Sequence, residues 1–194
     1  MRIIAIHLIA LLLTSFNSKD EVEYKQWLQF HHLKSADFVK VGNDIERKMM
    51  WEGYDLSPEI IELYQQFFIS APNKSHFVDM DTYSLILEEE KGELCSTGFG
   101  VDTEVKLIRS SNNQYARILF CGTACIPETG YWISNSVVEI LGFEFDGDGK
   151  AIPTRWRYDI PNSISSKYQI KECKLDLVED YVINVRLSKI NFKV

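Results

Sequence analysis

One imidazole and two carboxylates lie within six residues of sequence, in the segment HFVDMD that runs from His76 to Asp81. If this segment is extended, Asp79 and Asp81 lie on one face, because side chains alternate along a strand. A histidine beside two carboxylates can act as a general base that an acid orients, or it can hold a transition metal. The segment therefore supports a small secreted hydrolase that uses His76, Asp79 and Asp81. The alternative is a solvated loop.

No other segment carries a specific catalytic or cofactor motif. The sequence contains no G-x-S-x-G nucleophile turn, no H-E-x-x-H zinc helix and no P-loop. The turn from Asp146 to Gly149 resembles part of a calcium loop, with Glu144, Asp146 and Asp148 at the first three ligand positions. Arg155, however, stands where a calcium loop needs a bidentate glutamate. We therefore expect a hairpin turn there, and neither a resident metal nor a cofactor.

The four cysteines are an even number, which in an exported protein favours two disulfides. The favoured pairing is Cys121–Cys125 with Cys95–Cys173, a local staple and a bond between distant strands. Three pairings are possible, and loop entropy does not choose among them. A four-cysteine zinc site is the sharper alternative, but only one cysteine pair has the short spacing that such sites use.

The N-terminus has the composition of a signal peptide over residues 1–18. Arg2 precedes an apolar run of about 11 residues, from Ile3 to Leu13, and small polar residues follow up to Ser18. Because a membrane span needs about 20 residues, the run predicts a cleaved leader and no span after cleavage. We expect an exported protein, periplasmic or extracellular, in which residues 19–194 form a single domain.

The chain is acidic, with a formal charge of −7 that becomes about −8 when Arg2 leaves with the leader. This balance argues against nucleic acid as a ligand and suits a basic protein partner. Glutamates crowd around Lys91 and Gly92 and indicate a solvated turn. Side chains of the types that dominate interface hot spots are the candidates for partner contact: Trp51, Tyr54, Tyr131, Trp132, Arg155 and Arg157.

The first third of the sequence indicates helices. Tyr24, Trp27, Leu28 and His31 follow helical spacing and predict a helix over residues 20–40. A second short helix is expected over 44–51. Ser57 followed by Pro58 has the pattern of an N-cap and first helical position, so a third helix is expected to begin there. Helices therefore dominate residues 20–70.

Residues 80–194 indicate strands instead. A strand is expected over 82–88, and three hairpins follow at 104–109 with 115–121, at 137–145 with 152–158, and at 168–178 with 181–190. Consecutive hairpins form an antiparallel meander. The sequence thus predicts an α+β fold, in which N-terminal helices pack on a curved antiparallel meander of about six or seven strands.

These features together favour a non-catalytic role. We expect an exported binding protein for a basic enzyme or toxin, such as a periplasmic inhibitor or immunity-type protein, whose acidic surface steers the approach of its partner. The alternatives are the hydrolase centred on His76, Asp79 and Asp81, and a small-ligand-binding domain with a cavity between sheet and helices. No oligomeric state follows from the sequence.

Overall fold

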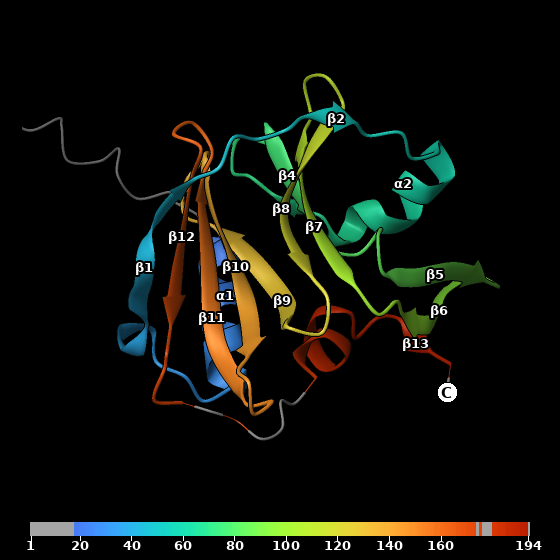
Figure 1. Ribbon diagram of the computed structural model, residues 1–194. Coiled ribbons are helices and arrows are strands. Elements are labelled where there is room, and N and C mark those ends of the chain that lie inside the picture. The colour runs from blue at the N-terminus through green and yellow to red at the C-terminus, as the bar shows by residue number, and fades with distance from the viewer. Residues whose placement is uncertain (1–17, 174, 176–179, 194) are drawn as a thin grey trace, which may run out of the picture.

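Three β-sheets make up most of the computed structural model, which describes residues 18–173, 175 and 180–193 (Figure 1). Sheet A has the strand order β1 (Val39–Glu46), β12 (Ile164–Gln169), β11 (Ala151–Asp159), β10 (Val137–Phe145) and β9 (Cys125–Trp132). Sheet B has the order β2 (Glu52–Gly53), β8 (Gln114–Cys121), β7 (Thr103–Arg109), β4 (His76–Asp79) and β3 (Ile69–Ser70). Sheet C has the order β13 (Asn191–Phe192), β6 (Glu93–Phe99) and β5 (Leu85–Glu90).

The helices of the described part are short. They are α1 (Ser18–Phe30), the 3₁₀ turn η1 (Ser35–Asp37), α2 (Pro58–Tyr64), the 3₁₀ turn η2 (Gln65–Phe67) and the π-helix η3 (Val182–Arg186). Residues 1–17, which hold almost all of the expected signal peptide, lie outside the described residues.

Sheet A lies between two cores. In Figure 1, α1 lies behind this sheet, and sheet B packs on the opposite face. Alternate side chains of β10 serve the two sides, as the two-residue period of a strand requires. Leu141 and Phe143 pack with Trp27 of α1, whereas Val138 and Ile140 pack in the core shared with sheet B. A strand buried on both faces in this way is apolar almost throughout.

A third core joins sheet C to α2 and to the segment that follows η3. Tyr64, at the end of α2, packs there with Leu85, Leu87, Leu187 and Ile190. The Tyr64 hydroxyl donates to the Leu85 carbonyl oxygen at 2.6 Å and accepts from the Leu87 backbone N–H at 3.1 Å. These two bonds hold the end of α2 against β5.

The predicted α+β fold, with N-terminal helices on a meander of six or seven strands, is wrong. The described residues are mostly β, with thirteen strands in three sheets. The helix predicted over 20–40 ends at Phe30, and part of the helix predicted over 44–51 is strand β1. β1 is an exposed edge strand with a bulge between Val41 and Ile45, so its own side chains show no two-residue pattern. Its pairing with the distant β12 determines its conformation.

Predictions that rest on short stretches of sequence agree better with the structure than the predicted fold does. Ser57 caps α2, since its hydroxyl oxygen accepts from the Ile60 backbone N–H at 3.4 Å, and Pro58 is the first helical residue, as predicted. The hairpins β7–β8 and β10–β11 are confirmed. The strand predicted over 82–88 begins only at Leu85.

The third predicted hairpin, 168–178 with 181–190, is wrong. β12 ends at Gln169 and pairs with β11 and β1, and residues 182–186 form the π-helix η3. The apolar residues after position 180 are spaced for a helical turn, which buries Tyr181, Leu187 and Ile190. Residues 126–130 belong to the edge strand β9 although they include a proline, and Pro127 stands opposite Gly142.

A close approach at this point requires glycine. β9 carries a bulge, because Leu141 pairs with Thr129 and Gly142 pairs with Pro127, which leaves Glu128 as the extra residue. A Cβ added to Gly142 would lie 2.0 Å from the carbonyl oxygen of Ile126. The chain can therefore cross here only without a side chain at position 142.

We predict that Gly142→Ala lowers the free energy of unfolding by about 3 kcal/mol, because backbone must move to admit the methyl group. Gly147→Ala is the control, since a Cβ there meets no atom within 4 Å. It should change the free energy by less than about 0.5 kcal/mol. Urea denaturation of both variants measures the difference, and equal stabilities would show that the crossing tolerates a side chain.

Candidate functional site

His76 does not meet the two carboxylates that the sequence placed beside it. His76 and Asp79 lie three positions apart on β4, so they occupy opposite faces. The His76 ring lies 6.3 Å from the Trp51 ring and 6.4 Å from the Trp132 ring, and its Nδ1 is 2.9 Å from the Ser75 hydroxyl. Burial and the nearby Arg109 guanidinium lower the pKa of His76. The ring therefore lacks the acid that would orient a general base.

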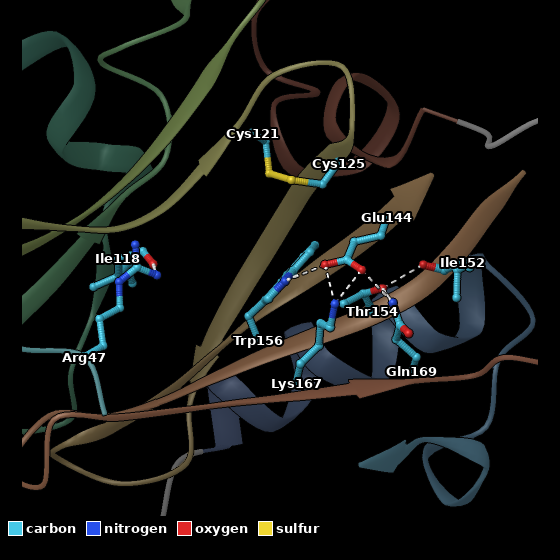
Figure 2. The surroundings of a disulfide bond; sticks show 10 residues. All are labelled: Arg47, Ile118, Cys121, Cys125, Glu144, Ile152, Thr154, Trp156, Lys167 and Gln169. Atoms are coloured by element: carbon cyan, nitrogen blue, oxygen red, sulfur yellow. Dashed lines mark hydrogen bonds and ion pairs between the residues drawn. A yellow bond between two sulfur atoms is a disulfide. The ribbon is translucent and has the colours of Figure 1, made fainter. Parts of the chain in front are cut away.

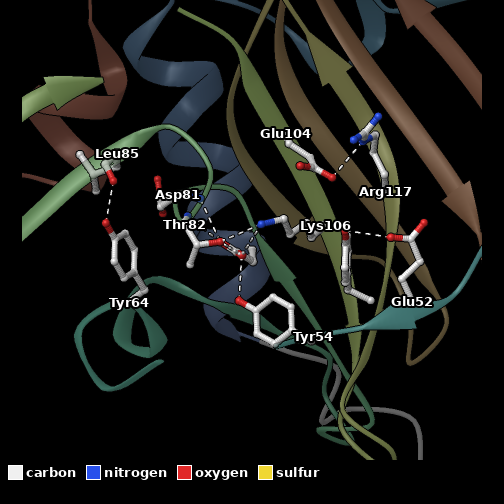
Figure 3. Close-up of polar contacts among 11 residues, drawn as sticks. Glu52, Tyr54, Tyr64, Asp81, Thr82, Leu85, Glu104, Lys106 and Arg117 are labelled. Carbon is white, nitrogen blue, oxygen red and sulfur yellow. Dashed lines mark hydrogen bonds and ion pairs between the residues drawn. The ribbon is translucent and has the colours of Figure 1, made fainter. Parts of the chain in front are cut away.

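Asp79 instead closes the turn after β4, where it contacts the Tyr54 and Thr82 side chains that Figure 3 labels. Its Oδ1 accepts from the backbone N–H groups of Asp81 and Thr82, at 3.0 Å each. Its Oδ2 accepts from the Tyr54 hydroxyl at 3.0 Å and from the Thr82 hydroxyl, and Lys106 Nζ is 4.0 Å away. A carboxylate that is 1% exposed and accepts four hydrogen bonds holds structure together.

Lys106 lies in a cage of tyrosines on the outer face of sheet B. Its ammonium donates to the Thr82 hydroxyl at 3.1 Å and lies 5.6–5.9 Å from the ring centres of Tyr54, Tyr83 and Tyr115. Aromatic faces attract a cation, so the three rings help to hold the ammonium group in place. Burial and the Asp79 carboxylate raise the pKa of Tyr54. Tyr54 is thus part of an internal network, and it is only 4% exposed.

Three other predicted contact residues meet at Glu139, a buried carboxylate on β10. Tyr131 donates its hydroxyl proton to Glu139, Arg157 Nε donates at 2.7 Å, and an Arg155 nitrogen lies 3.6 Å away. Arg155 also donates to the Tyr24 hydroxyl of α1 at 2.9 Å. Directly paired positions on neighbouring strands bring these groups together, since Glu139 stands opposite both Tyr131 and Arg157.

The six predicted contact residues consequently do not form an open surface. Tyr54, Trp132 and Arg155 are buried, and Trp132 donates its indole N–H to the Ile69 carbonyl oxygen at 3.0 Å. Trp51 is half-buried and stacks under the Arg109 guanidinium at 3.9 Å. Residue types that dominate interfaces also dominate cores, and composition alone does not separate the two.

Only one of the two predicted disulfides is confirmed. Cys121 and Cys125 form a disulfide with a Cα–Cα distance of 5.2 Å, which ties β8 of sheet B to β9 of sheet A (Figure 2). Cys95 and Cys173 are free thiols, so the predicted Cys95–Cys173 bond is absent. Cys95 is buried in sheet C, whereas Cys173 packs beside the α1 core, and the two side chains serve different parts of the fold.

A cluster around Glu144 lies near the disulfide in Figure 2. Glu144 accepts from Lys167 at 2.8 Å, from the Gln169 amide at 2.8 Å and from the Trp156 indole at 3.3 Å. The Phe145 backbone N–H donates to the Ala124 carbonyl oxygen inside the disulfide loop at 2.9 Å. These bonds align the end of β10 with the turn that the disulfide closes.

The β9 bulge places Glu128 toward α1, in a position that sequence reasoning missed. Glu128 is 2% exposed, and its Oε2 accepts from the Trp27 indole N–H at 2.7 Å and lies 2.8 Å from His31 Nε2. Two residues in a bulge oppose one on the partner strand, which breaks the normal alternation. No spacing in the sequence marks such a residue, so no pattern could have found it.

A second buried ion pair lies close to this carboxylate. Arg186 of η3 contacts both oxygens of Asp81, at 2.6 and 2.8 Å, and its Nε is buried without a hydrogen-bond partner. The pair ties η3 to the turn after β4. π-helices are rare and often occur at functional sites.

Two pockets adjoin η3, and a further pocket lies apart from it beside α2. One of about 410 Å³ lies between α1, η3 and residues 66–72, and another of about 310 Å³ lies between the β6–β7 turn, β9 and η3; Arg186 lines both. A third, of about 300 Å³, lies between α2 and the β5–β6 hairpin, and its lining residues are Glu59, Glu62, Leu63, Gln66, Glu89 and Leu94.

Among the described residues, no group of three or more histidine, cysteine, aspartate or glutamate side chains is arranged to hold a metal ion. In the same part of the chain, no helix has the length and apolar character needed to span a membrane. Comparisons with protein-family models, curated proteins and solved structures found no match.

We predict that the Asp81–Arg186 pair is strongly coupled. Asp81→Asn or Arg186→Met alone should lower the free energy of unfolding by about 3–5 kcal/mol, because each leaves a buried charge without its partner. The double variant should lose less than the two single losses together, by about 1–3 kcal/mol. Urea denaturation of the unchanged protein, the two single variants and the double variant completes a double-mutant cycle. Additive losses of stability would show that the Asp81–Arg186 pair does not hold η3.

Proposed function

We propose that this chain is an exported, non-catalytic binding protein whose partner is a basic protein, such as a cationic enzyme or toxin. The docking site is the acidic pocket, defined as the pocket of about 300 Å³ between α2 and the β5–β6 hairpin. One observation carries the proposal: the charged side chains that line this pocket are all glutamates, Glu59, Glu62 and Glu89, and the apolar lining is Leu63 and Leu94.

This lining matches the chemistry of a lysine or arginine side chain. Such side chains have an apolar stem and a charged head, so the stem can pack on Leu63 and Leu94 while the head meets the carboxylates. Charge-assisted hydrogen bonds to carboxylates are among the stronger polar contacts in proteins. An acidic or neutral partner would leave the glutamates opposed or unused, which favours a cationic one.

The pocket is held in a fixed shape by contacts already described. The Ser57 cap sets the start of α2, and the two hydrogen bonds of Tyr64 hold its end to β5. Glu59 and Glu62 on α2 therefore keep their position relative to Glu89 on β5. A preformed site loses less entropy on binding than a flexible one.

The acidic surface continues beyond the pocket. The β5–β6 hairpin adds Glu88, Glu90 and Glu93, all exposed. Lys193 pairs with Glu90 at 2.5 Å and with Glu88 at 3.7 Å, and neutralises part of this charge. With a net charge of −7 for the chain, this face suits a partner whose approach is accelerated electrostatically.

Export is supported by two independent features. Residues 1–18 have the composition of a signal peptide. The Cys121–Cys125 disulfide suits an oxidising compartment, either the periplasm or the extracellular space. The hydrolase alternative has less support, because His76 lies on the opposite face of β4 from Asp79.

We predict that neutralising the carboxylates of the acidic pocket weakens binding of the partner. The full chain with a C-terminal tag is purified from its native host under non-reducing conditions, and bound proteins are identified by mass spectrometry. A basic partner should accompany the unchanged protein. The triple variant Glu59→Gln, Glu62→Gln and Glu89→Gln should bind it about tenfold more weakly, since exposed charge pairs contribute up to about 1 kcal/mol each.

The matched control changes the same number of charges elsewhere, at the exposed positions Glu46→Gln, Asp148→Asn and Glu172→Gln. It should retain the partner, and the association rate should fall as salt rises. An equal loss in both triple variants, no loss in either, or an acidic partner would contradict the acidic pocket as the docking site.

A further inference from the structure

The largest of the three pockets described above differs from the proposed docking site. The large pocket, as we call it, encloses about 410 Å³ between α1, η3 and residues 66–72. Among the described residues, the one that lines both this pocket and the acidic pocket is Gln66. A volume of this size lies within the range of small-molecule sites. The lining residues come from segments far apart in the sequence, so the pocket forms only in the folded chain.

Two buried hydroxyl groups line the large pocket without a protein partner. Thr129 of β9 and Tyr181, which directly precedes η3, are each 2% exposed. In the described part of the chain, the fully buried side-chain atoms that lack a hydrogen bond are Arg155 Nε and Arg186 Nε, and neither hydroxyl bonds another described group. Solvent therefore reaches both hydroxyls, and the pocket that they line is the route.

The polar groups of this lining can both donate and accept. Each hydroxyl does so, and so does the amide of Gln26, an exposed residue of α1 that lines the same pocket. Burial and the Glu23 carboxylate raise the pKa of Tyr181 to about 12, so its hydroxyl keeps its proton at neutral pH. Groups of this kind match the hydroxyl groups of a ligand, which also donate and accept.

The charges that line the large pocket cancel. They belong to Glu23, Lys74 and Arg186. Arg186 contacts both oxygens of Asp81, so its charge is already matched, and the other two residues have opposite signs. A neutral ligand therefore fits this lining better than an anion or a cation. A ligand rich in oxygen atoms also suits the Arg186 Nε–H, a buried donor without a partner.

Apolar side chains supply the rest of the lining. Phe67 of η2, Phe68 directly after it and Val185 of η3 are all partly buried and line the pocket. Aromatic rings offer a large apolar surface. A pyranose ring presents C–H groups on its faces and hydroxyl groups around its rim. It can therefore pack on the phenylalanines while its hydroxyl groups meet the polar part of the lining.

We propose that the large pocket binds a neutral saccharide. One sugar ring packs on Phe67 and Phe68, and its hydroxyl groups bond Thr129, Tyr181 and Gln26. An analogue without hydroxyl groups should be rejected, because the polar groups of the lining would lose water and gain no partner. A charged sugar would lose hydration of its charge and gain no opposite charge.

The test compares neutral sugars with matched analogues. The neutral probes are the methyl glycosides of glucose, galactose, mannose and N-acetylglucosamine. Methyl glucuronide and methyl glucosaminide are the charged probes, and cyclohexylmethanol lacks the ring hydroxyl groups. Binding to the full chain, with its disulfide formed, is followed by NMR titration at neutral pH. At least one neutral glycoside should bind in a saturable manner, about tenfold more tightly than the charged sugars and cyclohexylmethanol, with shifts centred on the large pocket.

Variants that remove one polar group at a time test the contacts. Thr129→Val and Tyr181→Phe should each weaken the glycoside about fivefold and leave cyclohexylmethanol unchanged. Both should fold, because neither hydroxyl bonds a described protein group. Tyr158→Phe is the control, since Tyr158 is also 2% exposed but does not line the pocket. Gln26→Leu should weaken the glycoside about threefold, whereas Gln29→Leu, exposed on the same helix outside the lining, should not.

Three results would each overturn the saccharide assignment. They are the absence of saturable binding by all four neutral glycosides, binding of a charged sugar or cyclohexylmethanol that is at least as tight, and equal affinities for Tyr181→Phe and Tyr158→Phe. If a hydroxyl variant is unfolded, equal effects of Gln26→Leu and Gln29→Leu also overturn it.

The triple variant of the acidic pocket separates the two proposals. Glu59, Glu62 and Glu89 do not line the large pocket, so their replacement by glutamine should leave the affinity for the glycoside unchanged. Loss of the sugar in that variant would contradict the large pocket as its site. Loss of the basic partner alone would bear only on the acidic pocket.

Discussion

The burial of Glu128 is the constraint on which much of the arrangement depends. A carboxylate that is 2% exposed must find hydrogen-bond donors, and Trp27 and His31 supply them from α1. The bond therefore fixes the helix to sheet A as well as satisfying the acid. It exists only because the β9 bulge turns Glu128 to the α1 side, and the bulge in turn brings β9 so close to β10 that position 142 must be glycine. One extra residue in an edge strand thus links a helix, a sheet and a pocket wall.

The same solution recurs at two other buried carboxylates. Glu139 is matched by Arg157 and Tyr131 within sheet A, and Asp81 is matched by Arg186 across two elements. Such pairs contribute little net stability, because desolvation offsets most of the attraction. They do, however, penalise every arrangement in which one partner is left alone in the interior. We infer that they select this packing of η3 and α1 over alternatives with similar apolar burial.

The features that were predicted correctly from the sequence are those that depend on residues next to one another in the chain. Ser57 with Pro58 begins α2, and the turns at 110–114 and 146–149 specify two hairpins, because each depends on local backbone preferences. β1 was not predicted because an exposed edge strand has no buried face and therefore no alternation of apolar and polar residues. The segment after Asp180 was predicted wrongly because its apolar residues suit both a strand and a helical turn. Tyr131, Arg155 and Arg157 are residue types common at interfaces, but all three contact Glu139. Glu139 lies on β10, whereas Tyr131 is on β9 and the arginines are on β11, so the sequence does not show that they meet. The acidic pocket combines Glu59 with Glu89, from elements whose proximity only the folded chain reveals.

The internal ion pairs also determine how the surface is charged. Asp81 and Arg186 neutralise each other inside the protein, and the buried Glu139 is neutralised by the half-exposed Arg157. The net charge of −7 is therefore expressed by exposed groups, and the β5–β6 hairpin carries a dense share of it. A surface of this kind raises the encounter rate with a cationic partner and repels acidic ones before any contact forms. In the function proposed above, α2 and β5 hold the acidic pocket in a fixed shape, so the long-range field and the short-range fit would act on the same cationic side chain of a partner.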